Sequence, residues 1–324
     1  MQKQLLQLTL PAVLGILPAA CGTGTDSGDK GSTLDASQTQ TPVKMTQSTG
    51  LSSNSSFSLR LTDAPIDNLR RVVVQFTGVE LKLQSGGWVK FAFDTPQSID
   101  LLQLQGGNTA DLLTNVPAPA ASYSEIRLFT GSGGMVNFVE QSGGGIEPLQ
   151  IPGGSGAGMA LRENFVIKSA QTASFIIDFD LRQSVRSPGK SGKFQFKAVM
   201  QLVTASGVGG FRGEVDPLRL ANPPSVCSDN MIDSFNAAYV FKGHDVKPSD
   251  INQLKPNVEP VSTTGIKFDK ASGKHLYEAA FLPAGDYTVA VTCNADLDNL
   301  ETDDDLKFFD IRNITVVANN IVFL

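Results

Sequence analysis

From residue 57 to the end of the chain, apolar and polar residues alternate in short runs that are separated by Gly, Pro, Asn and Ser. The period of two is clearest in residues 57–61, 79–83 and 173–181. Alternation of this kind is typical of strands with one buried face, whereas an amphipathic helix has an apolar period of 3.6. Only residues 100–104 and 109–113 suit a short helix. The pattern therefore predicts an all-β chain built of β-sandwiches.

A Gly-containing stretch at residues 204–210 separates two series of predicted strands. The length of 324 residues suits two domains better than one. We therefore predict two β-sandwiches in tandem, of immunoglobulin-like or prealbumin-like type. The first covers residues 57–205 and the second covers residues 211–324.

Residues 1–20 have the pattern of an export signal. Lys3 precedes an apolar stretch at residues 5–17, and Ala19 and Ala20 stand directly before Cys21. The apolar stretch is shorter than the ~20 residues that a membrane-spanning helix needs. The segment resembles a bacterial lipoprotein signal peptide, in which the cysteine carries the lipid after cleavage. The alternative is an ordinary secretory signal with an incidental cysteine.

Lipidation at Cys21 implies an anchored protein of the cell envelope, with palmitate among its expected acyl chains. Gly22 follows the cysteine, where an Asp would favour retention in the inner membrane of enteric bacteria. The expected location is therefore the outer membrane of a Gram-negative bacterium. Residues 21–56 are rich in Ser, Thr, Gly and Gln, which predicts a flexible tether between the lipid and the first sandwich.

The remaining cysteines are Cys227 and Cys293. Because exported proteins occupy an oxidising compartment, we predict a disulfide between them. The chain-entropy model gives about 4 kcal/mol for a loop of that length. The alternative is a pair of buried free thiols.

Composition excludes several classes of protein. A net charge of −6 argues against nucleic-acid binding, which requires a basic surface. Two His and three Cys leave few of the usual parts for metal or nucleophilic chemistry, and His244 and His275 are expected at the surface. The Gly-rich residues 131–158 lack the Gly-Lys-Ser/Thr of a phosphate-binding loop. We therefore expect no enzyme activity and no required cofactor.

Asp178 and Asp180 lie on one face of the predicted strand at residues 173–181, opposite its apolar residues. At ~3.3 Å per residue, their Cα atoms are about 7 Å apart. Such a pair can belong to an ion-pair network, with Arg127 or Arg182 as the partner. The alternatives are a calcium site and, less favoured, acid–base catalysis.

A second acidic group lies on a predicted loop near the end of the chain. Its candidate metal ligands are Asp296, Asp298, Asp303, Asp304 and Asp305. Clustered carboxylates bind calcium when the backbone makes them converge. The spacing differs from the helix-flanked calcium loop, because no Gly follows Asp298. Calcium is therefore a possible ligand, and a solvated loop is the alternative.

Residues 56–203 resemble a bacterial family known as domain of unknown function 4382. The matching segments are LTDAP (61–65), VEL (79–81), GWV (87–89), IDLLQL (99–104), YSEIRL (123–128) and IDFD (177–180), with SV (184–185). The chain departs from the family's usual Gly-Leu-Lys near residues 158–160 and from its Lys-Pro near residues 197–198. The resemblance implies an exported lipoprotein of β-sandwich type and no established activity.

The C-terminal part is similar to the prealbumin-like, carbohydrate-binding-like sandwiches found in many surface proteins. The similarity rests on FLPAGDYTV (281–289), where a turn feeds a core strand and Tyr287 can brace the corner.

These observations favour a non-enzymatic envelope lipoprotein that binds a protein or glycan partner or has a structural role. One alternative is a glycan-binding or adhesion module, and a less favoured one is a hydrolase that uses Asp178 and Asp180.

Overall fold

Strands make up nearly all the regular structure of the computed structural model. It describes residues 43–47, 54–64, 66, 69–186, 193–221, 235–252 and 258–324. The predicted signal peptide (1–20), Cys21 and Cys227 lie outside the described residues. Among the described residues, no helix has the length and apolar character needed to cross a membrane.

Residues 43–204 form two sheets. The larger has ten strands, with the path β1-β4-β3-β7-β8-β13-β12 and with β6, β9 and β10 beside it. The smaller has four strands in the order β14-β11-β2-β5. The strands of the larger sheet are β1 (Val43–Gln47), β3 (Leu69–Leu83), β4 (Trp88–Asp100), β6 (Ala121–Thr130), β7 (Phe138–Gln141), β8 (Ile146–Gln150), β9 (Met159–Leu161), β10 (Phe165–Ile167), β12 (Val185–Arg186) and β13 (Phe194–Phe196). Those of the smaller sheet are β2 (Ser55–Ala64), β5 (Ala110–Ala118), β11 (Thr172–Asp180) and β14 (Met200–Thr204).

A single apolar core fills the space between these two sheets. Phe57 from β2, Phe91 from β4 and Phe175 from β11 stack together in it, with ring centroids 6.0–6.2 Å from Phe57. The alternation of the sequence places these residues inward, and burial of each such ring contributes roughly 2–3 kcal/mol.

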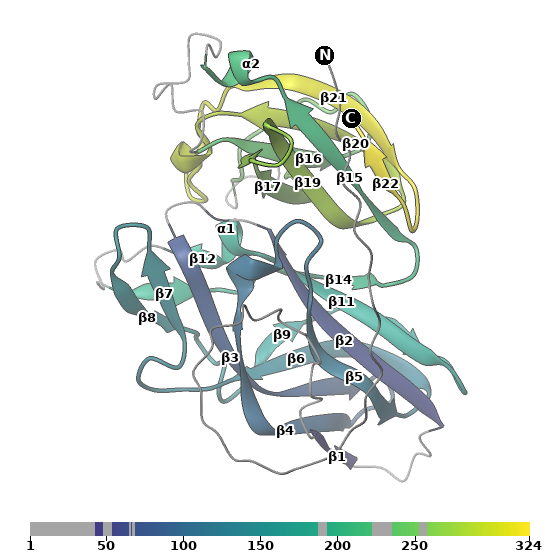
Figure 1. The fold of residues 1–324 in the computed structure, drawn as a ribbon. Helices are drawn as coiled ribbons and strands as arrows, with labels where there is room; N and C mark the ends of the chain where they lie inside the picture. The colour runs from purple at the N-terminus through teal and green to yellow at the C-terminus, as the bar shows by residue number, and fades with distance from the viewer. Residues whose placement is uncertain are drawn as a thin grey trace, which may run out of the picture. The chain divides into compact units, whose positions relative to one another are not determined.

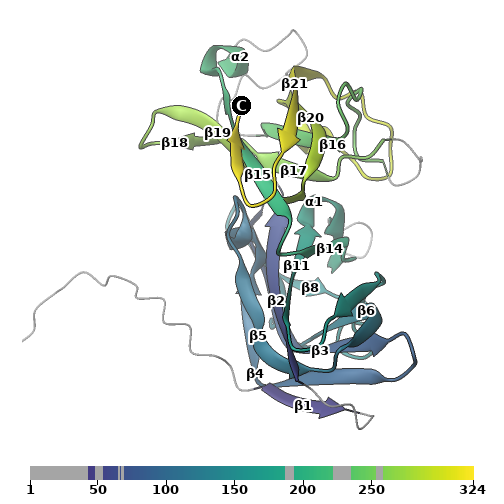
Figure 2. The same ribbon diagram turned by 90° about the vertical axis from the view of Figure 1, so that its right-hand side faces the viewer.

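Residues 208–323 form two further sheets of four strands each, in the orders β18-β19-β15-β22 and β17-β16-β20-β21. Their strands are β15 (Val208–Val215), β16 (Ala237–Lys242), β17 (Ser262–Gly265), β18 (Lys267–Asp269), β19 (Lys274–Pro283), β20 (Gly285–Thr292), β21 (Phe308–Val316) and β22 (Ile321–Phe323). Figures 1 and 2 show β16, β20 and β21 side by side, as their pairing requires. A second apolar core, which includes Phe211, Val240 and Val289, lies between these sheets. The prediction of an all-β sandwich fold is confirmed.

Among the described residues, the strands are connected by four short helices: η1 (Leu101–Leu104), α1 (Leu181–Ser184), α2 (Pro217–Ala221) and η2 (Ala295–Leu297). β19 ends at Pro283 and β20 begins at Gly285, so the turn between them falls within residues 281–289, as predicted. Tyr287 braces this corner as expected, because its hydroxyl donates to the carbonyl of Pro283 at 2.7 Å.

The β14–β11–β2–β5 sheet meets the last part of the chain, and residues 40–324 form one contact unit. We call this meeting place the seam. A small apolar cluster of Ile176, Val203 and Val208 lies there, with Phe281 packed against it. Polar contacts between described residues that cross the seam include Arg182 Nη1 to the Ala295 carbonyl (2.8 Å), Arg186 Nη1 to Glu301 Oε1 (2.9 Å), and Lys267 Nζ to Gln105 Oε1 (2.7 Å). The division into two domains at residues 205–211 stays a prediction.

The predicted tether, residues 21–56, is too long at its C-terminal end. Residues 43–47 form β1, which pairs antiparallel with β4 from Val43↔Phe93 to Gln47↔Val89. Val43 and Met45 alternate with polar residues, and that local signal is masked by the overall polar composition on which the tether prediction rests.

Candidate functional site

The seam face of β11 carries Asp178 and Asp180. The opposite face of the strand buries Phe175, Ile177 and Phe179 in the first core, as the alternation predicts. β11 lies between β14 and β2 in its sheet. It pairs parallel with β2 and antiparallel with β14. Both carboxylates line a cavity of about 190 Å³ whose other wall is formed by residues 260–262.

Asp180 is the N-cap of helix α1. Its Oδ1 accepts a hydrogen bond from the backbone N–H of Gln183, and its Oδ2 accepts one from Gln183 Nε2, both at 2.9 Å. An Asp at this position supplies an acceptor for the otherwise unpaired N–H groups of a helix start. Burial raises the pKa of Asp180, and the Gln183 bonds and the charge of Arg182 oppose that rise.

Asp178 lies in a different environment from Asp180. No hydrogen bond to its carboxylate is formed by the residues that the structure describes. Burial, with repulsion from Asp180 as a second cause, raises the pKa of Asp178 to about 7. Asp178 therefore keeps its proton to a higher pH than an exposed aspartate does.

The expected pairing of Arg127 with this carboxylate pair is wrong. Arg127 belongs to β6 of the larger sheet, where Nε lies 2.5 Å from Glu125 Oε1 and the guanidinium lies 4.3 Å from the ring centroid of Trp88. Glu125 is on the same outer face of its own sheet, so it is the nearer carboxylate. Arg182, the other candidate, is the arginine at the seam. It is 7% exposed, and its charge lowers the pKa of Asp180.

A second acidic group lies on the C-terminal side of the seam. Ligand-type oxygens of Asp250, Asp298 and Asp304 all lie within 4.8 Å of one another. We call these three residues the carboxylate cluster. The sequence indicated Asp298 and Asp304, whereas Asp250 comes from a loop about 50 residues earlier. Asp296, Asp303 and Asp305 are exposed and lie outside the cluster.

Protein donors hold the carboxylate cluster in place. The hydroxyl of Tyr239 and the N–H of Ile251 donate to Asp298. The N–H of Asp304 donates to Asp250 Oδ2 at 2.7 Å. Burial raises the pKa of Asp298 to about 6, although the Tyr239 bond and the charge of Arg182 act in the opposite direction.

Sequence reasoning missed Asp250, Tyr239 and Glu259. Glu259 accepts the N–H of Asn252 at 3.1 Å, and burial raises its pKa, with Asp250 and Asp180 adding repulsion. The one local signal for Asp250 is its position directly before Ile251, whose side chain is fully buried. A loop residue of this kind can be assigned to a site only when the tertiary structure shows which distant residues lie beside it.

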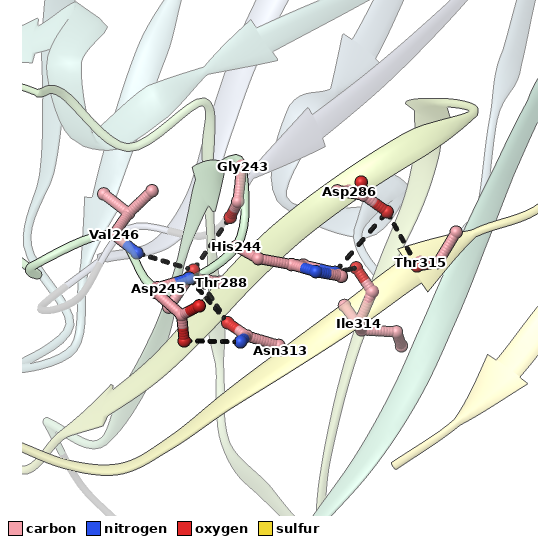
Figure 3. Close-up of polar contacts among 9 residues, drawn as sticks. All are labelled: Gly243, His244, Asp245, Val246, Asp286, Thr288, Asn313, Ile314 and Thr315. Carbon is pink, nitrogen blue, oxygen red and sulfur yellow. Dashed lines mark hydrogen bonds and ion pairs between the residues drawn. The ribbon is translucent and has the colours of Figure 1, made fainter.

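His244 lies in a polar group at the end of β16, which Figure 3 shows. Its Nε2 is 3.2 Å from the Ile314 carbonyl and 3.4 Å from Asp286 Oδ1, and Thr315 donates to the same oxygen. Thr288 and Asn313 tie the adjoining residues 243–246 to β20 and β21. The group therefore fastens a surface loop, as expected for His244. His275 is only 5% exposed, so its predicted surface position is wrong.

Cys293 is buried near the end of β20. Its predicted partner Cys227 lies outside the described residues, so the Cys227–Cys293 disulfide stays a prediction.

The fold is that of an all-β protein whose paired sheets enclose apolar cores. Residues 54–198 match the family described as "Domain of unknown function (DUF4382)", in agreement with the resemblance of residues 56–203. No curated protein sequence shows a significant match to this chain.

Two solved structures are similar over most of this chain. The Bacillus anthracis TIE protein has 11% identity and a TM-score of 0.17, over 82% of this chain and 33% of its own. GBS52, the minor pilin of Streptococcus agalactiae, has 8% identity and a TM-score of 0.18, over 83% of this chain and 94% of its own. The chain thus spans about a third of the length of the TIE protein.

Proposed function

We propose that this chain is a non-catalytic module of the bacterial cell envelope, which a lipid on Cys21 holds at the outer membrane and which binds a partner or supports surface structure. The position of Cys21 after a short apolar segment and two alanines supports the proposed location. The hydrogen bonds that Asp180 accepts support a function without catalysis.

Acid–base hydrolysis by a carboxylate pair needs both groups available to the substrate. Both oxygens of Asp180 already accept hydrogen bonds from Gln183, and those bonds cap helix α1. Freeing Asp180 for catalysis would leave the N–H of Gln183 without its acceptor. This engagement of Asp180 is the observation that carries the non-catalytic proposal.

Fractionation of cells that express the protein tests the proposed location. In a Gram-negative host, the wild-type chain is expected in the outer-membrane fraction and Cys21→Ala in the soluble periplasmic fraction. Cys21→Ser serves as a second variant with a closer side chain. Membrane association that is unchanged in both variants contradicts the lipid anchor.

Turnover is tested separately. Purified protein is incubated with a panel of aryl glycosides and aryl esters, next to Asp178→Asn. We expect no release above the buffer rate from either protein. Release by the wild type that is lost in Asp178→Asn would establish the hydrolase alternative instead.

Exposed aromatic rings favour glycan binding as the second candidate function. Phe323 on β22 is 73% exposed and Phe268 on β18 is 47% exposed, and flat rings of this kind stack on sugar faces. Trp88 is less suited, because Arg127 and Lys82 lie over its ring. Glycan-array signals that Phe323→Ala or Phe268→Ala abolishes would support this candidate, and a flat array would remove it.

A further inference from the structure

Polar and apolar residues together line the cavity beside Asp178. The polar residues are Asp178, Asp180, Gln183, Gln201 and Ser262. The apolar residues are Val199, Pro260, Val261 and Met200, and the Met200 side chain packs against the first core. No Lys, Arg or His is among the described residues that line it. Its volume of about 190 Å³ is far above the roughly 10–15 Å³ that one water molecule needs.

The two carboxylates in this cavity differ in what they can offer to a ligand. Asp180 is held by Gln183 and is near the charge of Arg182. Asp178 receives no hydrogen bond from any described residue, and burial raises its pKa. Asp178 is only partly exposed, and a partly buried carboxylate without a partner is costly, so a cation within hydrogen-bond distance offsets that cost.

A neighbouring small cavity provides an independent observation. It has a volume of about 20 Å³ and shares Asp178 and Ser262 with the larger one. Thr263, which lines it, is 1% exposed, and its hydroxyl has no hydrogen-bond partner within the described chain. Buried hydroxyls are nearly always paired, so this one marks a place for an ordered polar group or water beside Asp178.

The chemistry of the lining selects the class of cation. A calcium ion takes six to eight oxygen ligands, and here one carboxylate is free while the other is engaged. A primary ammonium needs only a few acceptors, which the Asp178 carboxylate and the side-chain oxygens of Gln201 and Ser262 can supply. Val199, Pro260 and Val261 then contact the carbon chain.

We propose that the seam cavity binds a small primary ammonium compound, with Asp178 as the counter-ion and with Val199, Pro260 and Val261 in contact with its carbon chain. This goes beyond the envelope function, because the cavity lies entirely within residues 178–262 and does not depend on the lipid anchor. The ammonium can belong to a free amine or to a lysine side chain, and the experiment separates these sources.

Isothermal titration of the purified chain with n-butylammonium chloride at pH 8 tests the proposal. We expect saturable binding that is weakened at least tenfold in Asp178→Asn. Asp111→Asn is the matched control, because it removes one carboxylate from an exposed position on the same sheet, and its affinity should equal that of the wild type. Binding of Nα-acetyl-lysine amide in addition would assign the source to lysine side chains, and its absence would assign it to free amines.

The same titration identifies the results that overturn the proposal. No heat with either amine contradicts it, as does equal affinity in Asp178→Asn. Binding of calcium chloride that is lost in Asp178→Asn, without amine binding, would show that the cavity is a metal site. Circular dichroism of each variant confirms that the fold is retained, so a loss of binding is not a loss of structure.

Discussion

Arg182 is the residue on which the seam most depends. Its guanidinium donates to the Ala295 carbonyl at 2.8 Å and lies 6.0 Å from the ring centroid of Tyr239. Its charge lowers the pKa values of both Asp180 and Asp298. One buried cation thus compensates carboxylates from both sides of the seam.

Replacement of this cation tests its role. We expect Arg182→Met to lower the free energy of unfolding by about 3 kcal/mol, because the apolar stem is kept while buried carboxylates lose their compensating charge. Arg162→Met is the control, since the Arg162 side chain is 76% exposed, and it should change stability by less than about 0.5 kcal/mol. Urea denaturation measures both. Equal effects of the two substitutions would contradict this account of the seam.

The raised pKa of Asp178 has a consequence for stability. Its folded-state pKa of about 7 lies above its ordinary value of 3.8, so folding favours the protonated form. The contribution to stability is complete below about pH 4 and is lost as the pH rises through 7. Asp178→Asn should therefore raise the free energy of unfolding at pH 8 by between about 1 and 4 kcal/mol, and should change it little at pH 4.

Chemical denaturation of the wild type and Asp178→Asn at both pH values measures this difference. Asp111→Asn corrects for the general effect of removing a charge. A stability gain of the same size at pH 4 and pH 8 would mean that ionisation of Asp178 is not the cause.

At the scale of elements, β15 shows what the glycines near the predicted domain boundary do. A Cβ on Gly213 would overlap the ring of Tyr277 on the adjacent strand β19. Tyr277 is fully buried and stacks edge-on against Phe211, so it has no room to move. Gly213 therefore permits the ring of Tyr277 to lie close to the backbone of β15.

We predict that Gly213→Ala lowers the free energy of unfolding by about 1–3 kcal/mol through overpacking. Gly143→Ala is the matched control, because its added Cβ meets no atom within 4 Å. Thermal denaturation of the two variants gives the comparison. A Gly213→Ala variant as stable as Gly143→Ala would show that the ring of Tyr277 can shift after all.

The loop after η2 carries the calcium prediction, which now concerns Asp250 as well. We expect calcium to raise the melting temperature of the wild type by a few degrees, since a ligand that binds only the folded state stabilises it. Asp250→Asn should remove most of this shift, and Asp305→Asn, outside the carboxylate cluster, should leave it unchanged. Differential scanning fluorimetry with calcium and with a chelator measures the effect. No shift and no heat of binding in the wild type would end the calcium prediction.

Local alternation predicted the strands and their buried faces well, as β11 illustrates. It failed where long-range pairing decides: residues 109–113 suited a helix, yet Ala110–Ala118 is strand β5, held by its pairing with β2. The Ala-Asn-Asn sequence at residues 318–320 predicts a closing hairpin turn, yet β22 pairs in parallel with β15 and not with β21. Asp298 and Asp304 of the carboxylate cluster were predicted from the sequence. Asp250 was not, because it joins the cluster only through tertiary folding.

The whole molecule consists of paired sheets that share an acidic seam, and we propose that a lipid holds its N-terminus. The fold rests on two apolar cores and on a few specific polar contacts between them. The proposed location depends on the sequence of residues 1–21, which lie outside the described structure. The two parts of the account are independent, so each needs its own test.

The anchor is the central claim, and mass spectrometry of the mature N-terminal peptide tests it most directly. The protein is purified from the membranes of a Gram-negative host and digested in detergent. We predict a peptide that begins at Cys21 and carries the added mass of a diacylglyceryl group with a further acyl chain. A mature N-terminus at any other residue, or an unmodified thiol at Cys21, would contradict the account.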